Sequence, residues 1–276
     1  GWHNHSLTVS YTGSDATSGL ASCDPTESYA GPDSASATIS GACRDLAGNV
    51  APRSVVVKYD ATAPLVTSTP ARAANGAGWY NAPLAVTFAG TDPMSGLASC
   101  VQPQTYSGPD NATAALPGSC SDQAGNVRNA SFGLKYDATG PTTSANPARA
   151  AGPTGWYIAP IQVSFTAADA TSGVANCDAA KTYAGPDASA ATVSGSCRYN
   201  AGNIDADSLP LKYDATAPQV TAAPSRPANG AGWYNAPLAV SFSGGDATSG
   251  LASCDTQKSF SGPDSATAAV AGTCRD

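Results

Sequence analysis

The sequence is poor in residue types that helical and nucleic-acid-binding proteins use heavily. Glu27 is the only glutamate, charged residues make up 12% of the chain, and the formal net charge is −7. Helical proteins carry glutamate and lysine on their exposed faces, so this composition argues against helices. The negative charge argues against nucleic acid and anionic membranes as partners.

Motifs for chemistry are also missing. The two histidines, His3 and His5, are adjacent to Asn4 in one short stretch, and no CxxC occurs, so a zinc site lacks ligands. No nucleophile–base–orienter set and no glycine-rich phosphate loop can be assembled. No run of about 18 apolar residues exists, so the sequence predicts no membrane insertion. We therefore expect a protein without enzymatic activity and without a required cofactor.

What the sequence does contain is a repeat. The phrase GWYNAP stands at 78–83 and again at 232–237, with variants at 1–6 and 155–160, so each step is 77 residues. The repeat predicts four modules, of which the first lacks its opening strand and the last lacks its closing strand. Their expected bounds are 1–60, 61–137, 138–214 and 215–276.

Cysteines follow the same period, two to a module and always 20 residues apart. One structural disulfide in each module explains this pattern better than a metal or redox site, because further ligands are missing. Such a bond contributes roughly 3 kcal/mol to a small domain and implies an oxidising, extracellular location. The predicted pairs are Cys23–Cys43, Cys100–Cys120, Cys177–Cys197 and Cys254–Cys274.

The residues after the aromatic phrase alternate between apolar and small polar side chains. Leu84, Val86 and Phe88 share one face, which is typical of a half-buried strand. Short strands with turn phrases between them predict an all-β fold of tandem immunoglobulin-like sandwiches. A bulky residue directly before a core strand is expected to cover the core, and an exposed sugar-binding platform is the alternative. The residues concerned are Trp2, Trp79, Trp156 and Trp233.

Each module ends in a phrase such as KYDATAP that leads into the next module. Proline stiffens the backbone there, so we expect short, semi-rigid joints and modules arranged as a rod. The joint residues are Asp60, Pro64, Asp137, Pro141, Asp214 and Pro218.

Calcium is a weaker hypothesis for the joints. It needs six to eight oxygen ligands, and one joint aspartate with one turn aspartate supplies too few. Turn and cap roles account for these residues, so no metal site is predicted. The weak calcium candidates are Asp15, Asp92, Asp169 and Asp246.

The succession of phrases through 78–141, from GWYNAPLAVTF through SGLASC, SGPD and DQAGN to KYDATGP, carries a resemblance. It resembles the tandem immunoglobulin-like (Big/HYR-like) repeats of long secreted or cell-surface bacterial proteins. The resemblance covers essentially the whole chain. It implies a sandwich used as stalk, spacer or adhesive rod, and it implies no active site.

The main functional hypothesis is thus a structural segment of a long extracellular bacterial stalk or filament that self-associates or contacts neighbouring modules. One alternative is a set of adhesin repeats that bind glycans or host proteins through their loops. Another is a set of spacer modules in a larger secreted enzyme. The loop phrase DATSGLASCD recurs verbatim at 15–24 and 246–255, which favours the structural hypothesis, because binding usually resides in varied loops.

Overall fold

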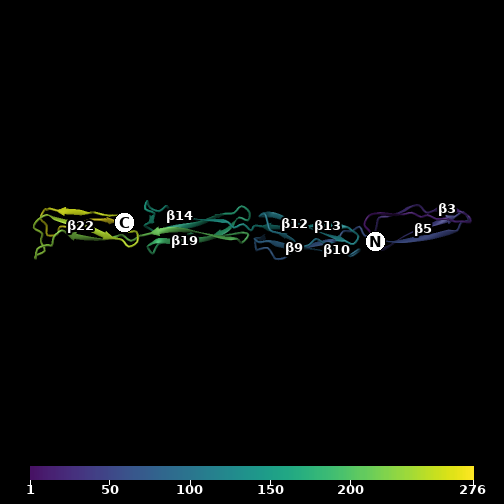
Figure 1. Ribbon diagram of the computed structural model, residues 1–276, viewed down its shortest axis with the longest axis horizontal. Coiled ribbons are helices and arrows are strands. Elements are labelled where there is room, and N and C mark those ends of the chain that lie inside the picture. The colour runs from purple at the N-terminus through teal and green to yellow at the C-terminus, as the bar shows by residue number, and fades with distance from the viewer. The chain divides into compact units, whose positions relative to one another are not determined.

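The computed structural model describes residues 1–276 and contains strands but no helix. Consequently, it offers no helix that could cross a membrane. The chain divides into two compact units, one comprising Gly1–Thr139 with Asn200–Gly202 and the other Gly140–Tyr199 with Asn203–Asp276. Each unit carries the strands of two modules, and each complete module is a two-layered sandwich (Figure 1). The expected all-β class of tandem immunoglobulin-like sandwiches is confirmed.

The first unit contains thirteen strands. Those of the first module are β1 (Trp2–His3), β2 (Leu7–Val9), β3 (Leu20–Cys23), β4 (Glu27–Tyr29), β5 (Ser34–Asp45) and β6 (Val50–Tyr59). Those of the second module are β7 (Leu65–Pro70), β8 (Trp79–Tyr80), β9 (Leu84–Thr91), β10 (Leu97–Cys100), β11 (Gln104–Tyr106), β12 (Asn111–Asp122) and β13 (Val127–Tyr136).

The second unit repeats this plan. The strands of the third module are β14 (Thr142–Pro147), β15 (Trp156–Tyr157), β16 (Ile161–Ala168), β17 (Val174–Cys177), β18 (Lys181–Tyr183), β19 (Ala188–Tyr199) and β20 (Ile204–Tyr213). Those of the fourth module are β21 (Gln219–Pro224), β22 (Leu238–Gly245), β23 (Ser253–Cys254), β24 (Gln257–Phe260) and β25 (Cys274–Arg275).

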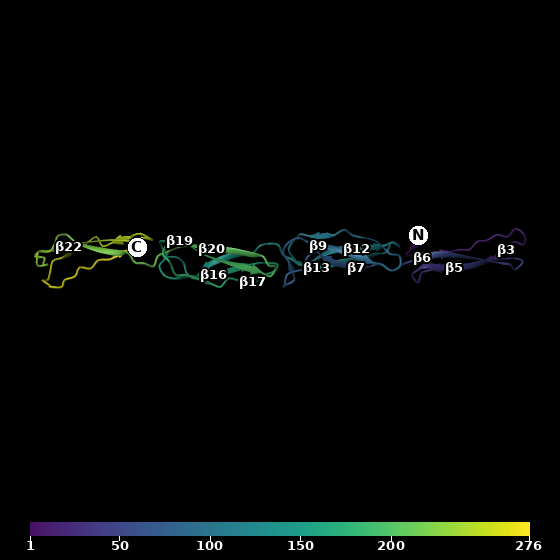
Figure 2. The same cartoon turned by 90° about the horizontal axis from the view of Figure 1, so that it is seen from below.

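In the second module one sheet has the order β11-β9-β7 and the other β10-β12-β13-β8. Figure 2 labels β7 and β9 of the first sheet and β12 and β13 of the second. The third module has the same two sheets, β14-β16-β18 and β15-β20-β19-β17. The long hairpin β12–β13 turns at the DQAGN phrase, as its Gly-Asn pair predicts, and Gly125 has a φ of 93°. Each terminal module contains one sheet of only two strands, β2-β4 in the first module and β23-β25 in the fourth.

The core lies between the two sheets. Leu84, Val86 and Phe88 on β9 are buried, as the alternation predicts. Phe88 lies against Gly118 of β12, where an added Cβ would come within 2.4 Å of its ring. Each module has this glycine opposite an aromatic ring, so the absence of a side chain lets the two sheets approach closely.

Candidate functional site at the module joints

The aspartate that begins each joint is held by its own backbone. The amide of Asp60 donates to the carbonyl of His3 at 2.8 Å, and the amide of Asp214 donates to Tyr157 at 3.0 Å. These bonds extend the parallel pairing between the aromatic phrase and the closing strand by one residue. Asp60 is fully buried, and its Oδ1 accepts the amide of Thr62 at 3.0 Å. The joint therefore begins in a fixed turn and not in a loose linker.

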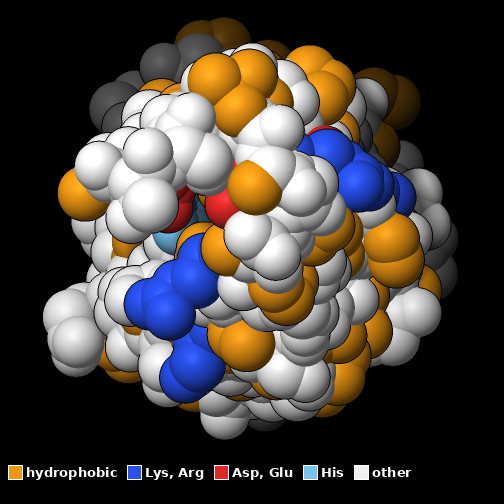
Figure 3. Space-filling view, turned by 90° about the vertical axis from the view of Figure 1, so that its right-hand side faces the viewer, with side chains coloured by type: hydrophobic (Ala, Val, Ile, Leu, Met, Phe, Trp, Pro, Cys, Tyr) orange, Lys and Arg blue, Asp and Glu red, His pale blue; other side chains and the backbone are white.

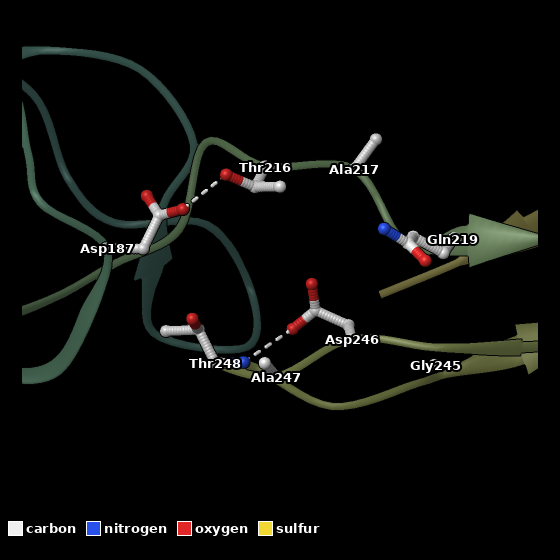
Figure 4. A pocket seen from close by; sticks show the side chains of 8 residues that line it. All are labelled: Asp187, Thr216, Ala217, Gln219, Gly245, Asp246, Ala247 and Thr248. Atoms are coloured by element: carbon white, nitrogen blue, oxygen red, sulfur yellow. Dashed lines mark hydrogen bonds between the residues drawn. The ribbon is translucent and has the colours of Figure 1, made fainter.

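The module before the joint also binds it, through the aspartate of the SGPD or AGPD phrase. Asp33 accepts the amide of Ala61 at 2.8 Å and the hydroxyl of Thr62. The Thr62 hydroxyl and then the Ala61 amide lower the pKa of Asp33 from its ordinary value, so the carboxylate is ionised at neutral pH. Asp187 holds Thr216 in the same way, and Figure 4 shows this contact.

The module after the joint binds it from the other side. Within the first unit, the amide of Ser95 donates to Asp60 Oδ2 at 3.1 Å. The side-chain nitrogen of Asn126 donates to the carbonyl oxygens of Asp60 at 2.9 Å and Thr62 at 3.3 Å. Within the second unit, the amide of Ser249 donates to Asp214 at 3.1 Å. A joint is therefore fastened to both of its modules.

Three carboxylates converge at each of these two joints. They come from the joint, from the DxxSG turn and from the position two residues after the second cysteine of the module, and one oxygen of each lies within 4.8 Å of the others. The two triads are Asp60, Asp92 and Asp122 in the first unit and Asp214, Asp246 and Asp276 in the second.

The triad carboxylates are oriented by backbone amides. Asp92 Oδ1 accepts the amides of Ser95 at 2.8 Å and Gly96 at 3.0 Å. Asp122 accepts the amide and the side-chain nitrogen of Asn126, both at 2.8 Å. The chain forms two ion pairs, Lys181–Asp178 and Lys258–Asp255, and neither involves a triad. The triad carboxylates thus lie close together without forming an ion pair to a lysine or arginine.

This geometry bears on the calcium candidates. Asp92 and Asp246 each belong to a triad, whereas Asp15 and Asp169 belong to no group of three. Asp15 accepts the amides of Ser18, Gly19 and Thr17, and these bonds lower its pKa. Three carboxylates are hard oxygen ligands and supply part of the six to eight oxygens that Ca²⁺ takes. The triads are the residues of this chain that could hold such an ion.

Sequence reasoning missed the third member of each triad. Asp122 and Asp276 follow the 77-residue period, but they lie far along the chain from the joint aspartates. The third module has Tyr199 at this position; its hydroxyl donates to the carbonyl of Ala168 at 3.2 Å, and burial raises its pKa. The 77-residue period aligns Asp122, Tyr199 and Asp276, so the sequence alone could have singled out this position.

The joint prolines and the joint aspartate of the middle phrase differ in burial. Pro64 is fully buried, Pro141 and Pro218 are half-buried, and Asp137 is fully buried. In the end view of Figure 3, uncharged side chains and backbone cover most of the face, and only small areas of acidic atoms are visible.

The tryptophans occupy different environments. Trp79 is 8% exposed and pairs with Lys135 of β13, whose Nζ lies 5.8 Å from the ring centroid. Trp2 and Trp156 are half-buried beneath Lys58 and Lys212 in the same way.

For Trp233 the expected core role is wrong, because this side chain is 54% exposed. Within residues 1–276 no strand pairs with the fourth aromatic phrase, so Trp233 has neither the parallel ladder nor the lysine that cover the other three rings. The exposure of this ring therefore accompanies the absence of the strand pairing that the other three rings have.

All eight cysteines are paired, and each bond joins residues 20 apart. Cys100 and Cys120 face each other on the neighbouring strands β10 and β12, with Cα atoms 4.0 Å apart. The bond therefore fastens an edge strand to its own sheet, whereas antibody domains bridge their two sheets. The other pairs are Cys23–Cys43, Cys177–Cys197 and Cys254–Cys274.

Comparison with known proteins adds little. No family model matches the chain, and no curated protein matches it. One solved structure, described as a tetra-tandem repeat in the extending region of a large adhesion protein, aligns with 79% of this chain and 68% of its own. It is 17% identical with a TM-score of 0.25. At this score the likeness supports no inference about this chain.

Proposed function

We propose that this chain is a structural segment of a long extracellular bacterial stalk or filament, with its modules joined end to end as a rod. The observation that supports this most directly is the double fastening of the joints. Asp33 holds Ala61 and Thr62 from the preceding module, while Ser95 and Asn126 hold Asp60 from the following one. A linker bound on both sides transmits orientation, which a spacer needs and a flexible tether does not.

The cysteines support the extracellular part of the proposal. Four disulfides and no free thiol suit an oxidising compartment, where such bonds persist. Modules of this size bury small cores, so a covalent staple matters more to them than to a larger domain. The disulfides and the doubly held joints together support the proposed place in an extracellular stalk.

Self-association is a further part of the proposal. Repeated modules present the same faces at fixed intervals along the chain, and small side chains on those faces allow close packing between neighbouring chains. The partners proposed are therefore other modules of the same protein, in the same chain or in another copy.

Small-angle X-ray scattering on the oxidised 276-residue chain tests the rod. We expect a maximum dimension close to four modules laid end to end, and the same profile over a range of concentrations below the onset of association. The joint variant Asn126→Ala, with Asn129→Ala as a matched exposed control on β13, should broaden the distance distribution. A compact particle in the unmodified chain would contradict the proposal.

Electron microscopy of native, unreduced material tests the assembly. Continuous filaments are expected for a structural fibre, and thin stalks with a separate globular tip would assign the modules to a spacer. Specific binding to a glycan array by the modules whose tryptophans are buried or half-buried would instead support the adhesin hypothesis.

A further inference from the structure

The third module departs from the repeat at the start of its closing strand. Asp205 and Asp207 lie on the inward side of β20, on the same face as Leu209 and Leu211. The residues 77 positions earlier, in β13, are Arg128 and Ala130. Acidic residues on the inward face of a strand are unusual, so their contacts are informative.

Both carboxylates bind the backbone of the first strand of the module. Asp205 Oδ2 accepts the amide of Thr143 at 2.8 Å, and Asp207 Oδ2 accepts the amide of Ala145 at 2.8 Å. β14 is an edge strand paired with β16, and alternate N–H groups of an edge strand point away from its partner, so these two amides are free to bind outside the sheet. The carboxylates therefore bridge the two sheets along one side of the sandwich.

The spacing of the two bonds gives the relative direction of the strands. A step of two residues along β14 matches a step of two in the same direction along β20, so the strands run parallel where they are bridged. Further along, β15 pairs in parallel with the end of β20, Trp156 opposite Lys212. The opening segment of the module thus follows the closing strand over its length.

Chain connectivity determines how a pulling force would reach these bonds. The chain enters the third module at the start of β14 and leaves it at the end of β20. Tension along the chain pulls two parallel strands in opposite directions, so both bonds are sheared together and not broken one after the other. Hydrogen bonds to an ionised carboxylate are also stronger than those between neutral groups.

We propose that Asp205 and Asp207 form a mechanical clamp that makes the third module more resistant to tension along the chain than the second module. The relevance of tension rests on the proposed stalk function, but the resistance itself belongs to the module. In the second module the equivalent amides are those of Val66 and Ser68, and the side chains of Arg128 and Ala130 contain no hydrogen-bond acceptor. The two complete modules of the chain thus provide an internal comparison.

Constant-force single-molecule unfolding of the oxidised chain tests the clamp. The two complete modules should give two unfolding events of equal length but different lifetime. The residues between Cys177 and Cys197 stay closed by the disulfide, so reduction should lengthen each step and identify it as the opening of one module. The double variant Asp205→Ala/Asp207→Ala should shorten the longer lifetime by roughly a hundredfold, since two bonds are lost and each bond to a charged group is worth about one factor of ten.

Three further variants complete the design. Asp205→Asn/Asp207→Asn retains a neutral acceptor, so its lifetime should fall between those of the parent and the alanine variant. Arg128→Asp/Ala130→Asp transfers the clamp to the second module and should lengthen the shorter lifetime. Ser208→Ala, an exposed change on the same strand, should leave both lifetimes unchanged.

An unchanged long lifetime in both the alanine and the asparagine variant would overturn the clamp. If the alanine variant fails to fold at zero force, the asparagine variant and the transferred clamp decide the question. The result is independent of the proposed function. A compact particle in scattering would contradict the stalk without touching the clamp, and equal lifetimes in a rod-shaped chain would contradict the clamp alone.

Discussion

The second and fourth modules have the same aromatic phrase, GWYNAP, in different surroundings. In the second module Trp79 is 8% exposed and Tyr80 is 5% exposed; in the fourth, Trp233 is 54% exposed and Tyr234 is 39% exposed. The arginine contact is kept in both, with Arg72 and Arg226 placed over the tyrosine rings at 5.1 and 5.6 Å. What differs is the closing strand, which pairs with the phrase in the second module and has no counterpart within residues 215–276.

The comparison shows that the local sequence around the tryptophan does not determine whether its ring is buried. Its local sequence is identical in the two modules, so the burial arises from a strand more than fifty residues further along the chain. The phrase is better understood as half of a contact whose other half is the KYD end of the module. The module core is closed only when both halves are present.

Among the variants considered, removal of the indole ring should give the largest difference in stability between the second and fourth modules. Trp79→Ala deletes a buried ring and should lower the free energy of unfolding of the second module by about 3–5 kcal/mol. Trp233→Ala, at an exposed position, should change the fourth module by less than about 0.5 kcal/mol. Hydrogen exchange of peptides covering β9 and β22 measures the two modules separately. Equal losses in both would show that the ring stabilises the module independently of the closing strand.

Filling the glycine contact should have a smaller effect within the second module. A methyl group at Gly118 meets the buried ring of Phe88, so Gly118→Ala should cost about 1–3 kcal/mol. Gly133→Ala on the neighbouring strand β13 is the matched control, since nothing lies within 4 Å of its added Cβ. If both variants unfold at the same denaturant concentration, close approach of the sheets is not what the glycine provides.

Added calcium tests whether the aspartate triads at the joints bind a metal ion. The triad at Asp60 gathers three carboxylates without a basic partner, so added Ca²⁺ should raise the midpoint of thermal unfolding by a few degrees, equivalent to about 1–2 kcal/mol at a concentration tenfold above the dissociation constant. Chelation should reverse the rise. Asp122→Asn should abolish the rise in the first unit, whereas Asp15→Asn should not. A midpoint insensitive to Ca²⁺ would leave these aspartates with turn and joint roles alone.

The smallest expected effect concerns acid. The Thr143 amide lowers the pKa of Asp205 from its ordinary value. Because the folded-state pKa lies below the unfolded one, the stabilisation is present above the unfolded value of about 4 and is lost as the pH falls through the folded pKa. Burial raises the pKa of the neighbouring Tyr199, so this hydroxyl stays protonated between pH 7 and 5, where we expect no effect. The free energies of unfolding of the parent and of Asp205→Asn, measured from pH 6 to 2, should converge at the acid end of this range.

The strands after the aromatic phrase were predictable, because Leu84, Val86 and Phe88 alternate and alternation is a local property. The hairpin at Gly125 was predictable for the same reason. The parallel pairing of Trp79 with Lys135 and the convergence of Asp60, Asp92 and Asp122 were not, since each depends on residues brought together by the topology. The exposure of Trp233 escaped prediction because identical letters were assumed to have identical surroundings.

The disulfides have one more consequence. Each closes a loop between neighbouring strands, and the peptide bonds from Cys100 to Cys120 lie inside that loop. A protease that cuts there opens the loop but leaves the two fragments covalently joined through sulfur. The same holds in every module, so about a quarter of the chain can be nicked without severing it. On a gel, a chain cut in these stretches would migrate at full length when oxidised and separate into fragments only after reduction.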